Sequence, residues 1–179
     1  MIRPRPALAA LIGALALTAC GVPPTGVPPT GVLDGGDPAG GLTKGLRLYF
    51  VSHSGRLEAV SRPGIRVPDA ENLINIVKYL ADLTDAERAS GLTSLVEDAG
   101  VQEVTAGDGT VTVDIAERYW DPSSRRDRNM TGQLVCSMAR ARALADPTGA
   151  TRTDDIRVTV RPENQPGREH VCSDFLGTQ

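Results

Sequence analysis

The chain has 179 residues, a formal net charge of −3 and a mean hydropathy of −0.16. Aromatic residues make up 3% of it, and its charges are mixed in sign without a polybasic run. Proteins that bind nucleic acid cluster Lys and Arg on one surface, so this composition excludes nucleic acid as an expected partner. The length suits one domain with short additional segments.

Residues 1–19 follow the order of a secretory signal peptide, in which a pair of arginines precedes an uncharged apolar run at 7–17. This run is shorter than the ~20 residues that a membrane-spanning helix needs. The sequence Leu-Thr-Ala-Cys-Gly at 17–21 then resembles the lipobox of bacterial lipoproteins. The resemblance implies cleavage before Cys20 and a lipid on its thiol, which would anchor the protein at the cell membrane on its extracytoplasmic face. The alternative is an ordinary secretory signal with an incidental cysteine.

Residues 20–44 have the composition of a tether. The sequence Gly-Val-Pro-Pro-Thr occurs at 21–25 and again at 26–30, and glycines are frequent in the stretch that follows. Proline stiffens a chain toward polyproline II and glycine loosens it, so neither part favours a packed core. We interpret the segment as a spacer between the membrane and a domain. A recognition motif for a proline-binding partner is the alternative.

The folded domain is expected at 45–179 and begins with a hairpin. An apolar run at 46–52 predicts a strand buried on both faces, and the alternating residues 56–60 predict its partner after a turn. Asp69 is a candidate N-cap for the helix that follows. The apolar stripe of that helix consists of Leu73, Ile76, Val77, Leu80 and Leu83.

Thr84 and Glu87 have the spacing of a capping box, which predicts a second, short helix that ends at Gly91. Strands are then expected at 101–105 and 110–115, because both segments are rich in β-branched residues. The sequence Gly-Asp-Gly between them predicts a tight turn and therefore a second hairpin.

Tyr119 and Trp120 are expected to cover one end of the core. A long helix is expected over 126–145, and the spacing of its apolar residues fits a helical period only imperfectly. The alternating residues 156–160 predict a further strand, and 170–172 predict a short last one. The order β-β-α-β-β-α-β(-β) indicates an α+β fold, in which two main helices pack on a small antiparallel or mixed sheet.

Cys136 and Cys172 are the two cysteines that remain once Cys20 carries a lipid. Export takes them to an oxidising compartment, where such a pair usually forms a disulfide. A bridge across this span would stabilise the fold by about 2–4 kcal/mol, mainly by restricting the unfolded chain. Two free buried thiols are the alternative, and the lack of a Cys-X-X-Cys spacing argues against a redox-active pair.

Three segments of the domain share a pattern with a known family. Residues 48–62 (Leu-Tyr-Phe-Val-Ser-His-Ser-Gly-Arg-Leu-Glu-Ala-Val-Ser-Arg) form a hairpin pattern, 83–94 a helix and connection, and 104–115 a hairpin with a Gly-Asp-Gly turn. Together they resemble the GerMN (sporulation and spore germination) domain, although Ala-Asp-Leu at 81–83 replaces the family's usual Gly-Pro. Its members include actinobacterial lipoproteins, some of which work beside sensor histidine kinases of envelope-stress or cell-division pathways. The resemblance therefore implies a sensor kinase as a partner.

Few residues suggest catalysis, and we expect no enzyme activity, no cofactor and no metal site. His53 and His170 are the only histidines, too few for a zinc site. Neither a nucleophile elbow nor a phosphate-binding glycine loop is found. The candidate carboxylates, which also fit turns and solvated loops, are Asp108, Asp114, Asp154 and Asp155. The polar stretch 121–129 is either a solvated loop before a helix or a surface for a partner or glycan.

These observations favour a non-catalytic, membrane-tethered binding or regulatory module that contacts a membrane protein such as a sensor histidine kinase. Two alternatives stay open. One is a cell-wall binding or assembly factor that contacts peptidoglycan or another envelope polymer. The other is an envelope enzyme that uses a pair of the candidate carboxylates.

Overall fold

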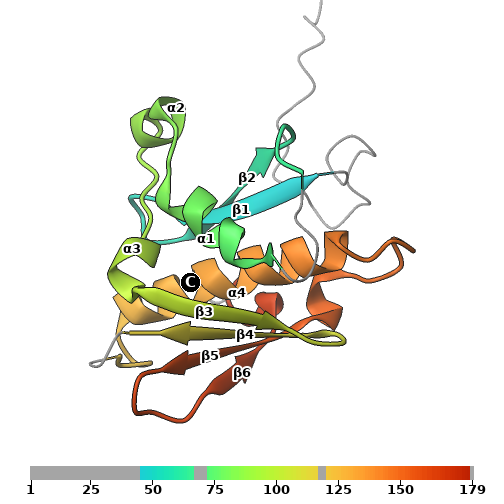
Figure 1. Ribbon diagram of the computed structural model, residues 1–179. Helices are drawn as coiled ribbons and strands as arrows, with labels where there is room; N and C mark the ends of the chain where they lie inside the picture. Colours follow the sequence, from blue (N-terminus) through green and yellow to red (C-terminus); the bar gives the residue numbers. More distant parts are fainter. Residues whose placement is uncertain (1–44, 67–71, 117–119, 178–179) are drawn as a thin grey trace, which may run out of the picture. The chain divides into compact units, whose positions relative to one another are not determined.

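Two sheets and one long helix organise the part of the chain that the computed structural model describes, residues 45–66, 72–116 and 120–177. These residues all belong to the compact unit Asp37–Gln179. The lipobox, the tether, the expected cap Asp69 and Tyr119 lie outside the described residues. The α+β class is confirmed, because helices and strands are mixed and the long helix α4 (Arg125–Leu144) packs on both sheets (Figure 1).

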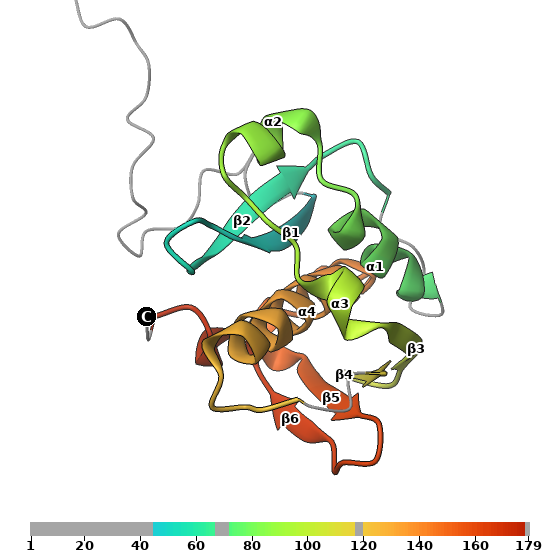
Figure 2. The ribbon, with the colours of Figure 1, turned by 90° about the vertical axis from the view of Figure 1, so that its left-hand side faces the viewer.

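The first hairpin consists of β1 (Leu46–Val51) and β2 (Leu57–Arg62), which pair antiparallel with Leu48 opposite Val60. β1 is buried along nearly its whole length, because it lies against α4 (Figures 1 and 2). β2 is the more exposed strand. The hairpin forms a sheet of its own, whereas the sequence predicted one sheet. Hairpins close through local contacts, and no sequence pattern specifies which distant strands join them.

Three short helices follow the hairpin: α1 (Ile74–Ala81), α2 (Asp85–Ala89) and α3 (Val96–Ala99). The predicted apolar stripe of α1 faces the core, although Val77 is only partly buried. The capping box of α2 is confirmed, since Glu87 N donates to Thr84 Oγ1 at 3.3 Å and Thr84 N donates to Glu87 Oε2 at 2.7 Å. The sequence did not predict α3, which has four residues and no side-chain cap.

The second sheet has the order β3-β4-β5-β6, with strands β3 (Val101–Ala106), β4 (Thr110–Ile115), β5 (Arg157–Pro162) and β6 (Arg168–His170). β4 and β5 are parallel and the other pairs antiparallel. Parallel neighbours need a long crossover, and α4 provides it. The last strand ends at His170 and not at 172 as predicted, because Cys172 begins a 3-10 turn.

α4 lies between the hairpin and the four-stranded sheet, which explains its imperfect apolar phase (Figure 2). Buried polar residues follow one another every four positions, at Asn129, Gln133 and Ser137. Residues four apart share a helix face. Their side chains bond to Gly55 O (3.0 Å), Leu95 N (3.0 Å) and Tyr49 N (3.0 Å) respectively. We call these three residues the polar row. They supply hydrogen-bond partners to backbone groups that would otherwise be buried against α4 without any.

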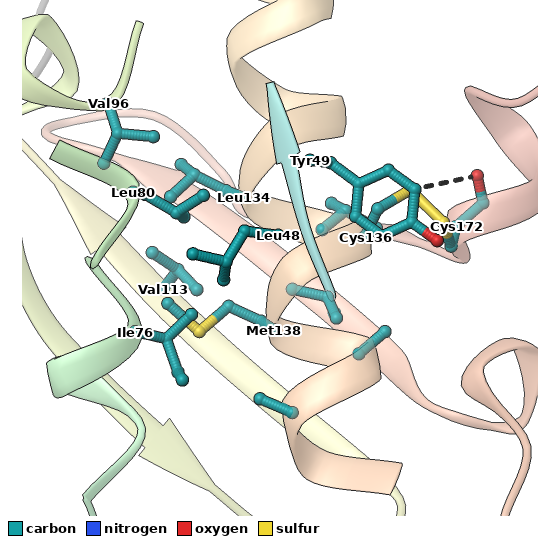
Figure 3. Close-up of a cluster of buried hydrophobic side chains, with 14 of the residues drawn as sticks. Leu48, Tyr49, Ile76, Leu80, Val96, Val113, Leu134, Cys136, Met138 and Cys172 are labelled. Atoms are coloured by element: carbon teal, nitrogen blue, oxygen red, sulfur yellow. Dashed lines mark hydrogen bonds between the residues drawn. A yellow bond between two sulfur atoms is a disulfide. The ribbon is translucent and has the colours of Figure 1, made fainter. Parts of the chain in front are cut away.

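Apolar side chains from three elements meet on another side of α4. Figure 3 shows Leu48 of β1, Val113 of β4, and Leu134 and Met138 of α4 in this cluster. Each of the four is 0% exposed, and burying such a side chain stabilises a fold by about 1.5–3 kcal/mol. Among the described helices, none has both the length and the apolar character needed to cross a membrane.

Candidate functional site

Arg56 lines two surface cavities of about 370 and 340 Å³, and the second of them lies at the start of α4. The remaining lining residues are Leu57, Glu58, Phe175, Leu176 and Gly177 in the first cavity, and Ser54, Gly55, Ser123, Arg125, Arg128 and Asn129 in the second. We call the two cavities together the arginine groove. Its sides come from the hairpin, from the first turns of α4 and from the C-terminal segment.

The hairpin side of the groove is held by its turn. Ser52 N donates to Arg56 O at 2.9 Å and Gly55 N donates to Ser52 O at 2.8 Å. Gly55 has φ +77°, a conformation that glycine adopts at little cost. Asn129 Nδ2 then donates to Gly55 O at 3.0 Å, which docks the turn on α4. The docked turn therefore positions Arg56 where it lines both cavities.

The α4 side is ordered by the polar stretch that the sequence left open as a possible partner surface. Ser124 caps the helix, because its Oγ accepts from Asp127 N at 3.2 Å. The buried Asp127 carboxylate accepts from Asp121 N at 2.8 Å and from Arg126 at 2.8 Å. Hydrogen bonds from the Ser123 side chain and backbone lower the pKa of Asp121 below its ordinary value. The segment at the start of α4 is therefore ordered by its own hydrogen bonds and is not only a solvated loop.

Three exposed arginines give the groove its charge: Arg56, Arg125 and Arg128. Within the described residues the Arg125 guanidinium forms no ion pair or hydrogen bond. Arg128 lies 5.7 Å from the Phe175 ring and donates to Asp174 O at 3.1 Å. Among the described residues that line the groove, Glu58 is the one carboxylate and is outnumbered by the arginines.

The C-terminal side is fastened by the disulfide. Cys136 of α4 and Cys172 are joined, with Cα atoms 4.6 Å apart, as the sequence predicted (Figure 3). The bond holds the start of the terminal segment on α4, and Phe175 packs edge-on against His170 at 5.3 Å. Burial lowers the pKa of His170 below its ordinary value, against the opposing charge of Asp174.

Gly132 allows both sides to approach α4. A Cβ at this position would lie 2.7 Å from Leu57 Cδ1 and 2.8 Å from Phe175 Cδ1, distances shorter than real contacts. The missing side chain therefore brings Leu57 and Phe175 together on one helix turn. No local pattern marks Gly132, Leu57 or Phe175 as site residues, because each matters through contacts between distant segments. The arginines at 125, 126 and 128 were the one available signal.

The candidate carboxylates do not form one site. Asp114 lies near the end of β4, whereas Asp108 lies in the turn that precedes this strand. Asp114 pairs with Arg161 at 2.6 Å, and Asp154 accepts from Ser173 N at 3.1 Å.

Asp108 and Asp155 do line one cavity of about 450 Å³, together with Asp146 and Arg142. The Asp146 carboxylate is held to its loop by hydrogen bonds from Thr151 and Thr148, and these bonds lower its pKa. Among the described residues no group of three His, Cys, Asp or Glu side chains is placed to hold a metal ion. His53 is exposed in the hairpin turn.

Comparisons with known proteins give no relative: no family model, no curated protein and no solved structure matches this chain. The chemistry of the groove therefore follows from its own residues. It offers guanidinium groups beside a buried aromatic ring and an exposed leucine. Arginine and aromatic side chains are enriched where proteins bind other proteins.

Proposed function

We propose that the chain is a lipid-anchored, extracytoplasmic binding module without catalysis of its own, and that it regulates a membrane protein through the arginine groove. The lipobox at Cys20 and the spacer at 20–44 support the anchor. The resemblance of 48–62, 83–94 and 104–115 to the GerMN domain supports a sensor histidine kinase of an envelope-stress pathway as the partner.

The arginine groove is the observation that carries this proposal. Three elements far apart in the sequence are fixed around it by the disulfide, the Asn129 bond to the turn and the close approach at Gly132. A surface that is held in shape loses little conformational entropy when a partner binds. The exposed arginines supply charge, and Phe175 and Leu176 supply apolar contact.

An anionic envelope polymer is the second candidate, and the arginines are the observation that favours it. Guanidinium groups bind phosphate and carboxylate through paired hydrogen bonds. A polymer would use this charge without a protein partner. Pull-down of the chain by isolated cell wall, lost on charge reversal in the groove, would support this candidate.

The test is crosslinking in living cells, followed by purification of the tagged chain from membranes and mass spectrometry of what accompanies it. We expect enrichment of one sensor kinase. Cys20→Ala should release the chain from the membrane and abolish the enrichment. Recovery of wall-synthesis proteins or wall fragments alone would contradict the proposal.

One double variant in the groove and one control variant outside it sharpen the experiment. Arg56→Glu combined with Arg125→Glu should remove the partner while the chain stays at the membrane. Arg152→Glu is the matched control, because Arg152 is exposed and lies beside the other end of α4, about 30 Å away along 20 residues. Equal capture by all variants would exclude the groove as the binding surface.

A further inference from the structure

We infer that the arginine groove binds an extended, acidic polypeptide segment, which adds a strand to the edge of β2 that no described strand occupies. The inference rests on the proposed function and specifies what the partner presents. It comes from two independent features of the described residues. One is the backbone geometry of β2, and the other is the charge and shape of the groove at its start.

The backbone groups of alternate β2 residues point away from β1. Val51 exchanges hydrogen bonds with Thr93, at 2.9 and 2.8 Å, so its N–H and C=O point away from β2. In an antiparallel pair, two directly opposite residues either both bond to each other through their backbone groups or both turn these groups away. Leu57 is opposite Val51, so its backbone groups also point away from the partner strand. The alternation then turns the backbone groups of Leu57, Ala59 and Ser61 outward. Among the described residues, no backbone hydrogen bond reaches them.

This edge carries little of the protection that natural sheets use against strand addition. Edges are normally blunted by charged side chains, prolines, bulges or covering elements. Between Leu57 and Ser61 there is no proline, and Glu58 is the one charged residue. The register with β1 is continuous, without a bulge. An incoming strand would therefore find a regular set of donors and acceptors.

The residues of the groove determine which side chains a bound strand should carry. Arg56 directly precedes β2, and Arg125 lies against Gly55, with Cδ 3.5 Å from the position of a Cβ there. Acidic residues near the hairpin turn would meet both guanidinium groups. A residue opposite Leu57 would place its side chain on the same face as Leu57, toward Phe175. Leu176, 45% exposed, adds apolar surface beside Phe175 that this side chain could contact.

The edge favours a polypeptide over an anionic polymer. A phosphate or glycan chain could use the arginines, but it has no regular amide pattern to match Leu57, Ala59 and Ser61. Strand addition uses main-chain hydrogen bonds for affinity and pockets for alternate side chains for specificity. Both parts are present here.

The first experiment selects ligands from a displayed library of random ten-residue peptides, with the full chain purified in detergent. We expect sequences in which acidic and apolar residues alternate. Arg56→Glu with Arg125→Glu should weaken the best peptide by roughly tenfold or more, because charge-assisted hydrogen bonds are lost. Arg152→Glu should leave its affinity unchanged. Selection of basic peptides, or equal binding by the double variant, would overturn the inference.

A second variant tests the strand. Ala59→Pro removes one outward N–H without touching the ladder to β1, and proline is tolerated at such edge positions. It should weaken the peptide by about tenfold, whereas Ala59→Thr, which keeps the N–H, should not. If Ala59→Pro lowers the melting temperature, its weaker binding could reflect unfolding, and hydrogen exchange of the backbone amides in the unaltered chain then tests strand addition. Peptide binding should then slow exchange at Leu57, Ala59 and Ser61, and unchanged exchange there would contradict strand addition.

Two further outcomes would replace this inference. If no peptide is selected, and soluble polyphosphate binds the unaltered chain but not the variant with Arg56→Glu and Arg125→Glu, the groove would be assigned to a polymer. A dimer in light scattering that Ala59→Pro abolishes would assign the edge to a second copy of this chain. Failure here is separate from failure of the proposed function, because the crosslinked partner in cells is identified without any assumption about β2.

Discussion

At the scale of single residues, the pair formed by Arg62 and Glu87 joins α2 to the hairpin. Arg62 donates to the two Glu87 carboxylate oxygens at 2.9 and 2.6 Å, and the Glu87 side chain is 8% exposed. Burial acts to raise the pKa of Glu87, but hydrogen bonds from Thr84 and Arg62 outweigh it, so the pKa falls below its ordinary value of 4.5. The ionised form is therefore favoured by folding.

This pair predicts a pH-dependent stability. Glu87→Gln should lower the free energy of unfolding by about 2 kcal/mol near pH 7, where the carboxylate is charged in both states. A lowered folded-state pKa gives stability that is complete above the unfolded pKa and is lost as the pH falls through the folded value. The difference between the two proteins should thus shrink below pH 4.5. Urea unfolding at several pH values measures it, and a constant difference would refute the account.

Gly132 gives the second prediction at this scale. Replacing a helical glycine by alanine normally stabilises a protein by about 0.5–1 kcal/mol. Here the added Cβ would lie 2.7 Å from Leu57 and 2.8 Å from Phe175. Gly132→Ala should therefore destabilise the fold by about 1–3 kcal/mol, as overpacking does. Thermal unfolding tests this, with Gly64→Ala as the control, because a Cβ there meets nothing within 4 Å.

At the scale of elements, the polar row decides how α4 meets the hairpin. Gln133 is 0% exposed; its Oε1 accepts from Leu95 N and its Nε2 donates to Ser94 Oγ, both at 3.0 Å. Gln133→Met keeps the volume and improves the apolar pattern of the helix. It should nevertheless cost about 1–3 kcal/mol of stability, because Leu95 N is left without a partner. Lys78→Met, at an exposed position, is the control, and an equal effect of both would contradict the role of the row.

The same row shows where prediction from sequence ends. The strands 46–51 and 110–115 and the stripe of α1 follow from local periodicity, and the structure contains all three. The interrupted phase of α4 could be seen in the sequence but not explained. Its polar residues are satisfied by Gly55, Leu95 and Tyr49, which lie 38 to 88 positions away. Four-residue α3 has too few residues to show a period.

At the scale of the whole molecule, the groove could not be predicted because it joins residues 54–58, 123–129 and 175–177. Each segment alone resembles a turn, a loop before a helix, or a terminus. The cysteine pair alone predicted a long-range contact, because Cys20 was expected to carry a lipid. Sequence reasoning therefore reached the disulfide and, as a possible partner surface, the stretch 121–129, but not the hairpin turn or the terminal segment that complete the groove.

That disulfide should couple stability to binding. Cys136→Ser combined with Cys172→Ser removes a bridge across 36 positions and should cost about 3 kcal/mol in free energy of unfolding. It should also loosen Phe175 and Leu176, which lie three and four residues after Cys172 and form one side of the groove. Partner capture should therefore fall even where the variant is still folded by circular dichroism. A reducing agent should reproduce both effects in the unaltered chain and neither in the double variant. Full capture by a folded double variant would show that the terminal segment is dispensable, and the groove would then be confined to the hairpin turn and α4.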